Sequence, residues 1–415
     1  MSDKNQLEFR IPAALLPRDG RFGCGPSKVR PEQIDAIVAR ATSVMGTSHR
    51  QAPVKDIVGS VRDGLVSLFD LPEGWEIVLG NGGSTVFWDA ATFGLIRTRS
   101  QHLVFGEFGG KFAEASNAAP HLEDAVVISS EPGTHPELVA DPTCDVYAFP
   151  HNETSTGVMM TPKRPAGDGL VVVDATSAAG GLAWKPREVD VYYFAPQKCF
   201  ASDGGLWFAA CSPKAIERIR EIKATKRWMP ASLDLSIALD NSVANQTYNT
   251  PALATLIMFD DQLKWMNSNG GLPFAAGRSA ESARSLYSWA DSRDFATPFV
   301  KDLAQRSNVV GTIDIDGVDY WVWKAIDVVE PAIVIAEYNA LFGADRTVSV
   351  PYAPDFVRSA AHPSRLYWGA SLAAFRHLAN AKGYAFIGCN SNGNNAYFVR
   401  GDLAQHPSIA QLKPY

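Results

Sequence analysis

The sequence predicts an α/β fold with a mainly parallel sheet of seven strands, followed by a smaller α/β region. Seven short apolar runs occur between residues 76 and 211, with helical patterns between several of them. Runs without polar alternation are typical of strands that are covered on both faces. At 415 residues the chain is also too long for one ordinary core, which predicts more than one domain.

The seven apolar runs are the expected strands. In sheets of this kind ligands bind at the carboxyl ends of the strands, so we look for chemistry in the residues after each run. From 225 to 250 the apolar residues show no clear period, so an irregular loop is expected. Helical patterns resume near residue 252. The runs are EIVLG (76–80), QHLVFG (101–106), AVVISS (125–130), DVYAFP (145–150), LVVVDAT (170–176), VYYFAP (191–196) and LWFAAC (206–211).

Charge and composition narrow the classes of partner. A formal net charge of −6 and a pI near 5.8 offer no basic surface for nucleic acid or anionic membrane, which favours small-molecule ligands. Five cysteines without a CxxC pair predict neither a disulfide framework nor a metal site. No run of eighteen apolar residues occurs, and the first residues lack the pattern of a secretory signal, so we expect a cytoplasmic protein.

A lysine and an aspartate follow two of the predicted strands. Asp174 comes directly after an apolar run, and Lys198 comes after the next run and before Gly204 and Gly205. Taken singly, Asp174 could cap a turn and Lys198 could be an exposed lysine. Together they suit an aldehyde cofactor such as pyridoxal 5′-phosphate, because the lysine forms a Schiff base and the aspartate keeps the pyridine nitrogen protonated.

Four further segments could complete such a site. Ser84 and Thr85 follow a glycine pair at a predicted helix start, which can bind a phosphate but is also an ordinary way to begin a helix. Phe108 could stack on a planar ring or belong to the core. His49 and Arg50 could bind a carboxylate or phosphate, or form a solvated polar pair. HNETSTG (151–157) adds hydroxyls and an amide.

Residues from about 20 to 314 resemble the phosphoserine aminotransferase family of actinobacterial type, whose members are fold-type I pyridoxal-phosphate enzymes. The matching segments occur in unbroken order and cover nearly three quarters of the chain. They are FGCGPSKVRPEQ, GTSHRQAPVK, LGNGGSTVFWDAATFGL, GEFGGKFA, HNETSTGV, VVVDATSAAGG, YYFAPQKCFASDGGLW, NQTYNTPA and TPFVKDLAQRSNVVGTID.

The resemblance implies a role for each candidate residue and a homodimer with shared sites. Lys198 would bind pyridoxal 5′-phosphate covalently and move a proton at the substrate α-carbon, and Asp174 would pair with the pyridine nitrogen. The remaining roles would be ring stacking by Phe108, a bond to the ring hydroxyl region by Thr154, phosphate binding by Ser84, Thr85 and Gln197 with Asn249 and Thr250 of a second subunit, and substrate binding by His49 and Arg50.

The reaction implied is amino transfer from glutamate to 3-phosphohydroxypyruvate, giving O-phosphoserine and 2-oxoglutarate in serine biosynthesis. Some relatives also act in vitamin B6 (pyridoxine) biosynthesis. Three alternatives stay open: an aminotransferase for another oxo acid, a protein that binds the cofactor but is catalytically impaired, and, least favoured, a methyltransferase.

After about residue 314 the sequence departs from this family. The predicted division is an N-terminal arm (1–20), a cofactor-binding large domain (21–265), the start of a small domain (266–314) and an atypical segment (315–415). The last segment resembles the later half of a class I methyltransferase domain, but the glycine-rich turn that would bind its cosubstrate is absent. It also lacks the segment that, by the resemblance, would carry the family's substrate-binding arginine. Nothing in the sequence places Arg358 or Arg365 in the site.

A shortened small domain would expose a sheet edge and an apolar face. We expect that exposure unless AIVIAEY (332–338) and GYAFIGC (383–389) supply replacement strands. We therefore expect the chain to bind the cofactor, and we expect turnover to depend on whether these segments replace the missing strands.

Overall fold

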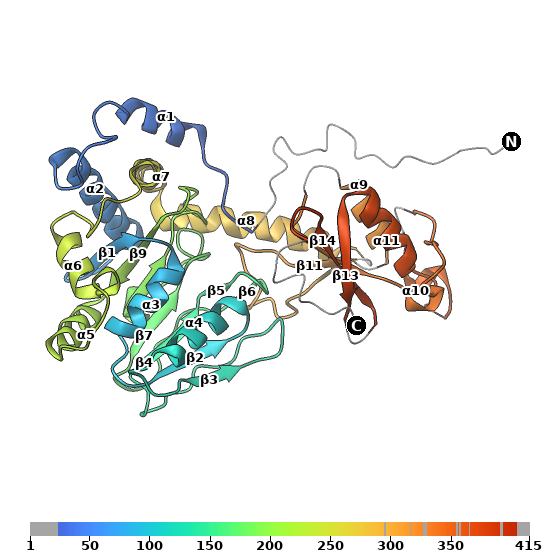
Figure 1. The fold of residues 1–415 in the computed structure, drawn as a ribbon, viewed down its shortest axis with the longest axis horizontal. Coiled ribbons are helices and arrows are strands. Elements are labelled where there is room, and N and C mark those ends of the chain that lie inside the picture. Colours follow the sequence, from blue (N-terminus) through green and yellow to red (C-terminus); the bar gives the residue numbers. More distant parts are fainter. Residues whose placement is uncertain are drawn as a thin grey trace. The chain divides into compact units, whose positions relative to one another are not determined.

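The structure is a computed structural model that describes residues 24–293, 296–315, 317–326, 330–353, 356, 358–364, 366–390 and 393–404 (Figure 1). The predicted N-terminal arm (1–20) and Arg365 lie outside the described residues. The chain divides into two compact units. The larger unit is Gly23–Ser288 with Phe299–Thr312, and the described part of the smaller unit comes from Trp289–Pro298 and from Ile313 onward. The four-part division made from the sequence stays a prediction.

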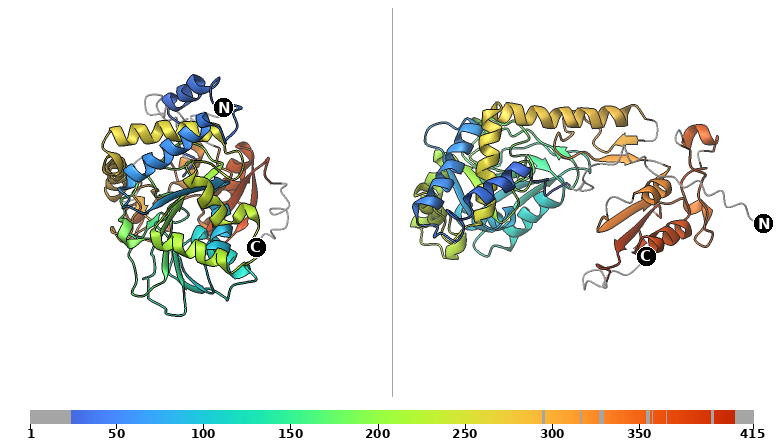
Figure 2. Two further views of the ribbon diagram at one scale, coloured as in Figure 1. Left: turned by 90° about the vertical axis from the view of Figure 1, so that its left-hand side faces the viewer. Right: turned by 90° about the horizontal axis from the view of Figure 1, so that it is seen from above.

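The larger unit is built on a seven-stranded sheet with the order β1-β9-β8-β7-β4-β2-β3 (Figures 1 and 2). Each strand falls on one of the seven predicted runs. Strand β9 is antiparallel to both of its neighbours, and the other pairs are parallel, so the predicted fold class is confirmed. The strands are β1 (Glu76–Asn81), β2 (Ser100–Val104), β3 (Val126–Ser129), β4 (Val146–Pro150), β7 (Leu170–Asp174), β8 (Val191–Phe194) and β9 (Leu206–Cys211).

The sheet lacks polar alternation because helices cover both of its faces. Along β7, Val171 and Val173 pack into one core cluster, while Leu170 and Val172 pack into another. The first cluster contains side chains of α2 (Ala52–Phe69) and α7 (Leu253–Ser268), and the second contains side chains of α3 (Ser84–Gly94) and α5 (Pro213–Ala224).

The sequence predicts an irregular loop from 225 to 250, but part of this segment is helical. It contains helix α6 (Leu235–Val243), which begins where the side chain of Asp234 accepts hydrogen bonds from the backbone of Ser236 and Ile237. Leu235 and Leu239, four residues apart, are buried against the sheet. The prediction was wrong because the helix is short and its start signal is one aspartate.

The other elements of the larger unit complete its surface. Helix α8 spans the boundary in sequence between the units. The elements are α1 (Pro31–Arg40), α4 (Glu107–Ala118), α8 (Gly271–Asp291), the hairpin β5 (Asn152–Glu153) and β6 (Val158–Met159), and the 3-10 turns η2 (Pro186–Glu188) and η3 (Ala231–Leu233).

The smaller unit has its own sheet, in the order β12-β14-β13, with both pairs antiparallel. The AIVIAEY and GYAFIGC segments form β12 (Ile333–Glu337) and β13 (Tyr384–Cys389), and β14 (Asn395–Arg400) lies between them. Its core contains Trp323, Phe375 and Phe398. The remaining elements are α9 (Asp319–Ala325), α10 (Arg358–Ala361), α11 (Leu372–Ala381), the pair β10 (Ala296–Pro298) and β11 (Ile313–Ile315), and η4 (Ala340–Phe342).

Strand β12 keeps an open edge in the described part of this sheet, where it pairs with β14 alone. Ile333 and Ile335 on this strand are 53% and 58% exposed, so the replacement strand itself leaves apolar side chains exposed beside an open edge. Among the described helices, none combines the length and apolarity that crossing a membrane requires.

Candidate active site

A cavity of about 230 Å³ lies where β4, β7 and β8 end, at the place that the parallel topology predicts for a ligand. Lys198 and Asp174 are the two charged residues among those that line it, and their charges are opposite. The lining residues are Gly83, Ser84, Thr85, Trp88, Phe108, Asn152, Thr154, Asp174, Thr176, Ser177, Gln197 and Lys198.

The structure brings together seven of the eleven residues named from the sequence. His49, Arg50, Asn249 and Thr250 are not among the residues that line this cavity. The seven that line it are Ser84, Thr85, Phe108, Thr154, Asp174, Gln197 and Lys198.

Lys198 is partly buried, and its ammonium group is close to the backbone of the segment before α1. Lys198 Nζ donates a hydrogen bond to the carbonyl oxygen of Cys24 at 3.2 Å. The next residue, Gly25, has φ of +126°, and a Cβ there would stand 2.6 Å from Lys198 Nζ. A glycine at position 25 therefore suits this backbone conformation and leaves the space that the lysine occupies.

The loop that carries Lys198 is held by a buried glutamine from α1. Ala201 has φ of +48°, a conformation that costs free energy for a residue with a side chain. Gln33 is fully buried, and its Nε2 lies 3.1 Å from the Ala201 carbonyl and 3.0 Å from Ser202 Oγ. These contacts fix the loop just after the lysine.

Asp174, the last residue of β7, is buried and its carboxylate is held by neighbouring donors. Oδ1 accepts a hydrogen bond from the Thr176 backbone at 2.8 Å, and Oδ2 accepts one from the Tyr193 hydroxyl at 3.0 Å. Burial raises the pKa of Asp174, and the hydrogen bonds act in the opposite direction. A cationic ligand at this carboxylate would remove the cost of burying an unpaired charge.

The start of α3 forms another wall of the cavity. Gly83 is the N-cap residue, and no side chain caps this end of the helix. Ser84 and Thr85 are the first helical residues, and the Ser84 hydroxyl accepts a hydrogen bond of 2.6 Å from Thr176. Uncapped backbone N–H groups at a helix start, with hydroxyls beside them, are suited to an anion such as phosphate.

The buried side chain of Glu153 positions both Phe108 and Thr154. One carboxylate oxygen accepts hydrogen bonds from the backbone of Phe108 at 3.2 Å and of Gly109 at 3.0 Å, at the start of α4. The other oxygen accepts from the backbone of Ser155 at 3.1 Å. Glu153 thereby joins the helix that carries Phe108 to the loop that carries Thr154.

The donor set fits the cofactor that the sequence predicts. Asn152 Oδ1 and Gln197 Oε1 are buried and have no hydrogen-bond partner among the described residues. Buried amides without partners are uncommon, and either end of an amide can turn toward a ligand. With an amine, a buried carboxylate and an uncapped helix start, the cavity offers a group for each part of a pyridoxal phosphate molecule.

Two of the four named residues that lie outside this cavity, His49 and Thr250, form a second polar group. The His49 ring (Nδ1) lies 3.2 Å from the Thr250 hydroxyl, and Thr250 carbonyl oxygen accepts a hydrogen bond from Asn81. Burial lowers the pKa of His49, and the positive charge of Arg50 lowers it further. Arg50 is exposed.

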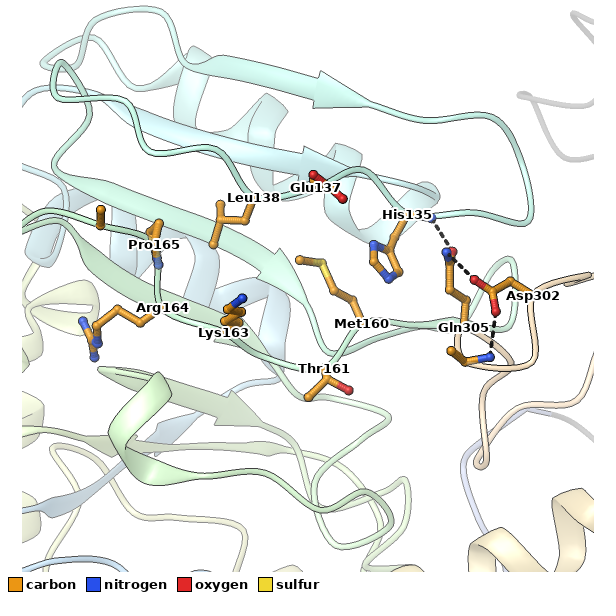
Figure 3. A pocket seen from close by; sticks show the side chains of 12 residues that line it. His135, Glu137, Leu138, Met160, Thr161, Lys163, Arg164, Pro165, Asp302 and Gln305 are labelled. Atoms are coloured by element: carbon orange, nitrogen blue, oxygen red, sulfur yellow. Dashed lines mark hydrogen bonds between the residues drawn. The ribbon is translucent and has the colours of Figure 1, made fainter.

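A roomier cavity of about 620 Å³ lies elsewhere in the larger unit (Figure 3). Three of its lining residues bind one another: Gln305 accepts from the His135 backbone and donates to Asp302. Arg164 forms an ion pair with the buried Asp190 at 2.7 Å. This cavity contains none of the residues that the sequence named, and volume alone does not make it the better candidate.

Five of the lining residues are not among the candidates named from the sequence: Gly83, Trp88, Asn152, Thr176 and Ser177. Of these, Gly83 belongs to the glycine pair before Ser84, and Asn152 is the amide of the HNETSTG segment. For Trp88 a signal existed, since it follows Thr85 by three positions and Ser84 by four, which places all three on one face of a helix. Thr176 and Ser177 directly follow Asp174 at a strand end. A tryptophan at helical spacing is nevertheless more often a core residue, so the spacing alone does not assign Trp88 to a site.

The fold and the lysine–aspartate cavity define a fold-type I pyridoxal-phosphate-dependent transferase. Solved structures share this fold at low identity. A phosphoserine aminotransferase from Cytophaga hutchinsonii matches with a TM-score of 0.65 and 17% identity over 94% of this chain and 95% of that one. One from Bacillus circulans matches with a TM-score of 0.63 and 19% identity over 73% and 85%.

Sequence relatives are much more similar. The phosphoserine aminotransferase of Rhodococcus jostii is 60% identical over 308 residues, covering 74% of this chain and 83% of that protein. That of a Nocardioides species is 58% identical over 316 residues, covering 75% and 84%. The chain belongs to the phosphoserine aminotransferase family. No family model matches it.

Proposed function

We propose that the chain transfers an amino group between glutamate and 3-phosphohydroxypyruvate, giving 2-oxoglutarate and O-phosphoserine, in serine biosynthesis and also in vitamin B6 biosynthesis. The observation that carries the proposal is that Lys198 and Asp174 line one cavity in a chain of which 308 residues are matched at 60% identity by a phosphoserine aminotransferase. The cofactor is pyridoxal 5′-phosphate, which when bound withdraws electrons from the substrate and carries the amino group between the two acids.

Lys198 and Asp174 have the central roles in this proposal. The Lys198 amine binds the cofactor covalently and, once substrate replaces it, moves a proton at the substrate α-carbon. The Asp174 carboxylate keeps the ring nitrogen protonated. Its burial supports that role, because an ionised carboxylate in a buried site favours a cationic partner.

The other lining residues bind and orient. Ser84 and Thr85 hold the phosphate at the start of α3 with Gln197, whose amide oxygen lacks a partner among the described residues. Phe108 forms a wall against the ring, and Thr154 binds the ring hydroxyl region.

The second polar group supports a homodimer with shared sites. His49, Arg50, Asn249 and Thr250 lie outside the Lys198 cavity of their own chain, and His49 and Thr250 lie within 3.2 Å of each other. We assign them to the partner's cavity, where Asn249 and Thr250 help to bind the phosphate and His49 and Arg50 bind the acidic substrates. We also assign the protein to the cytoplasm.

The C-terminal segment supports a second candidate, a cofactor-binding protein with impaired turnover. The match to the Rhodococcus relative covers 74% of the chain. We propose that residues 315–415 are a methyltransferase-like fragment in place of the family's closing segment. Its three-stranded sheet with α11 is an α/β arrangement consistent with such a fragment. Arg358, whose guanidinium lies 4.2 Å from the Trp368 ring centre, is not assigned to substrate.

Absorption spectra of the purified full chain test both candidates. With added cofactor, the wild type should show the absorption band of the lysine-bound cofactor, and glutamate should convert it to the band of the amine form. Lys198→Ala should abolish the first band, whereas Lys185→Ala, which changes an exposed lysine, should retain it. A band that does not respond to glutamate would favour impaired turnover, and no band would reject the cofactor.

A further inference from the structure

A chain of hydrogen bonds connects α3 to the carboxylate of Asp174 through two aromatic side chains. Trp88 Nε1 lies 2.9 Å from the Tyr193 hydroxyl oxygen and 3.3 Å from Asp174 Oδ2. An indole has one N–H, so its shorter contact is a donation to Tyr193. The Tyr193 hydroxyl then donates its own hydrogen to Asp174 Oδ2 at 3.0 Å.

All three side chains are buried, so water does not compete for these bonds. Their exposed fractions are 5% for Trp88, 0% for Tyr193 and 8% for Asp174. Asp174 and Tyr193 are register partners on neighbouring strands β7 and β8. The Tyr193 ring is held by Phe87, which stacks on it with ring centres 4.5 Å apart. In such surroundings a hydrogen bond to a carboxylate is stronger than at a surface, and linked bonds polarise one another.

We propose that Tyr193 and Trp88 are positioning residues that hold the Asp174 carboxylate in the orientation and charge state needed for the cofactor's ring nitrogen. Oδ1 is fixed by the Thr176 backbone and Oδ2 by Tyr193, which fixes the plane of the carboxylate. This inference rests on the proposed function.

Trp88 has a second task, because it is on the helix whose first residues line the same cavity. Ser84 and Thr85 begin α3, and Trp88 is one turn further along. The hydrogen bond from Trp88 thereby sets the position of the helix start relative to the carboxylate. These two places are where the proposed function puts the cofactor's phosphate and its ring nitrogen.

The neighbouring residue Tyr192 offers a matched control. It is on the same strand and is equally buried, but its hydroxyl contacts His151 Nδ1 at 2.9 Å and its ring stacks on Trp184. Successive residues of a strand point to opposite faces, so Tyr192→Phe and Tyr193→Phe remove the same atom on different sides of the sheet.

The test measures cofactor binding by equilibrium dialysis, and the pH midpoint of the bound cofactor's absorption band, in full-length variants whose folding is checked by circular dichroism. Tyr193→Phe should weaken binding about tenfold, as loss of one hydrogen bond to a charged group predicts. The pH midpoint of its absorption band should rise. Without the Tyr193 hydrogen bond the pKa of Asp174 is higher, so the carboxylate keeps the ring nitrogen protonated less well. A ring without that proton withdraws fewer electrons from the nitrogen that joins it to the lysine. Tyr192→Phe should leave cofactor affinity within about twofold of the wild type and should leave the pH midpoint of the band unchanged.

Trp88→Phe provides a second route to the same result. The double variant with Tyr193→Phe should lose less cofactor affinity than the product of the two single fold-losses, because Trp88 acts on the carboxylate oxygen through Tyr193. Equal losses in Tyr192→Phe and Tyr193→Phe, or an unchanged band midpoint in both Tyr193→Phe and Trp88→Phe, would overturn the inference. If the wild type itself binds no cofactor, the proposed function fails instead.

Discussion

Gly25 and Lys198 are so close that a side chain on the glycine would collide with the lysine. A Cβ at Gly25 would stand 2.6 Å from both Cδ and Nζ of Lys198. Since these atoms belong to the flexible end of the lysine, the lysine would give way rather than the backbone. The amine that the proposed chemistry needs would then be displaced.

Gly25→Ala should therefore reduce cofactor binding at least tenfold. It should also cost about 1–3 kcal/mol of stability, because φ is +126°. Gly46→Ala is the control: φ there is +76° and no atom of the described residues lies within 4 Å of the added Cβ, so it should cost stability alone. Equilibrium dialysis and urea unfolding separate the two effects. Equal affinities in both variants would show that the contact with Lys198 is unimportant.

Asp174→Asn should change how stability depends on pH in the cofactor-free protein. The pKa of Asp174 is raised by burial, so the stability it contributes is full below the ordinary carboxyl pKa of about 4 and is lost as pH rises through the raised value. Asparagine does not titrate. The variant should thus gain stability relative to the wild type between pH 4 and pH 7.

Urea unfolding at the two pH values checks this, with cofactor affinity measured at pH 7, where the variant should bind at least tenfold more weakly. A stability difference that does not vary with pH would contradict the assignment of Asp174 as a buried, ionisable group.

Arg50→Gln should raise the pKa of His49. Burial is the larger cause of the lowered pKa and remains in the variant, so the value should move toward 6.5 without reaching it. An NMR titration of the His49 ring, assigned with His49→Gln, measures the change. Lys185→Gln is the control for loss of a distant positive charge. If both variants leave the His49 pKa unchanged, Arg50 does not act on this ring.

Mixed dimers test the shared site. Lys198→Ala and Arg50→Ala should each be inactive alone. In a random one-to-one mixture, half of the dimers are hybrids, and each hybrid has one intact site of two, so about a quarter of wild-type activity should return. If both residues served the cavity of their own chain, mixing would restore none. Two copies of the same variant mixed together provide the baseline.

Phe375→Ala should destabilise the smaller unit by about 3–5 kcal/mol, because Phe375 is fully buried at the centre of its core. Leu341→Ala, at a side chain that is 65% exposed, should change stability by less than about 0.5 kcal/mol. Urea unfolding followed by tryptophan fluorescence compares them, since Trp323 stacks near Phe375. Equal midpoints would show that this cluster is not a stabilising core.

Much of the fold was predictable because each strand is a local signal. The runs that include Val171 and Tyr193 are apolar on both faces, and that pattern requires covering helices whatever the rest of the chain does. Helix α6 was missed because its start depends on one side-chain cap at Asp234. The tail was harder, since the local patterns of β12 and β13 do not show that β14 pairs between them.

The sequence by itself determined the order of the strands along the chain and the residue types at their ends, because hydrophobic period and turn chemistry are local properties. It therefore named Lys198, Asp174 and the residues of the α3 start. Only the tertiary structure decided which of these share one cavity, and that Trp88 donates to Tyr193, which in turn donates to the Asp174 carboxylate. Those contacts join residues 105 and 19 positions apart, and sheet pairing and helix packing, not spacing along the chain, bring them together.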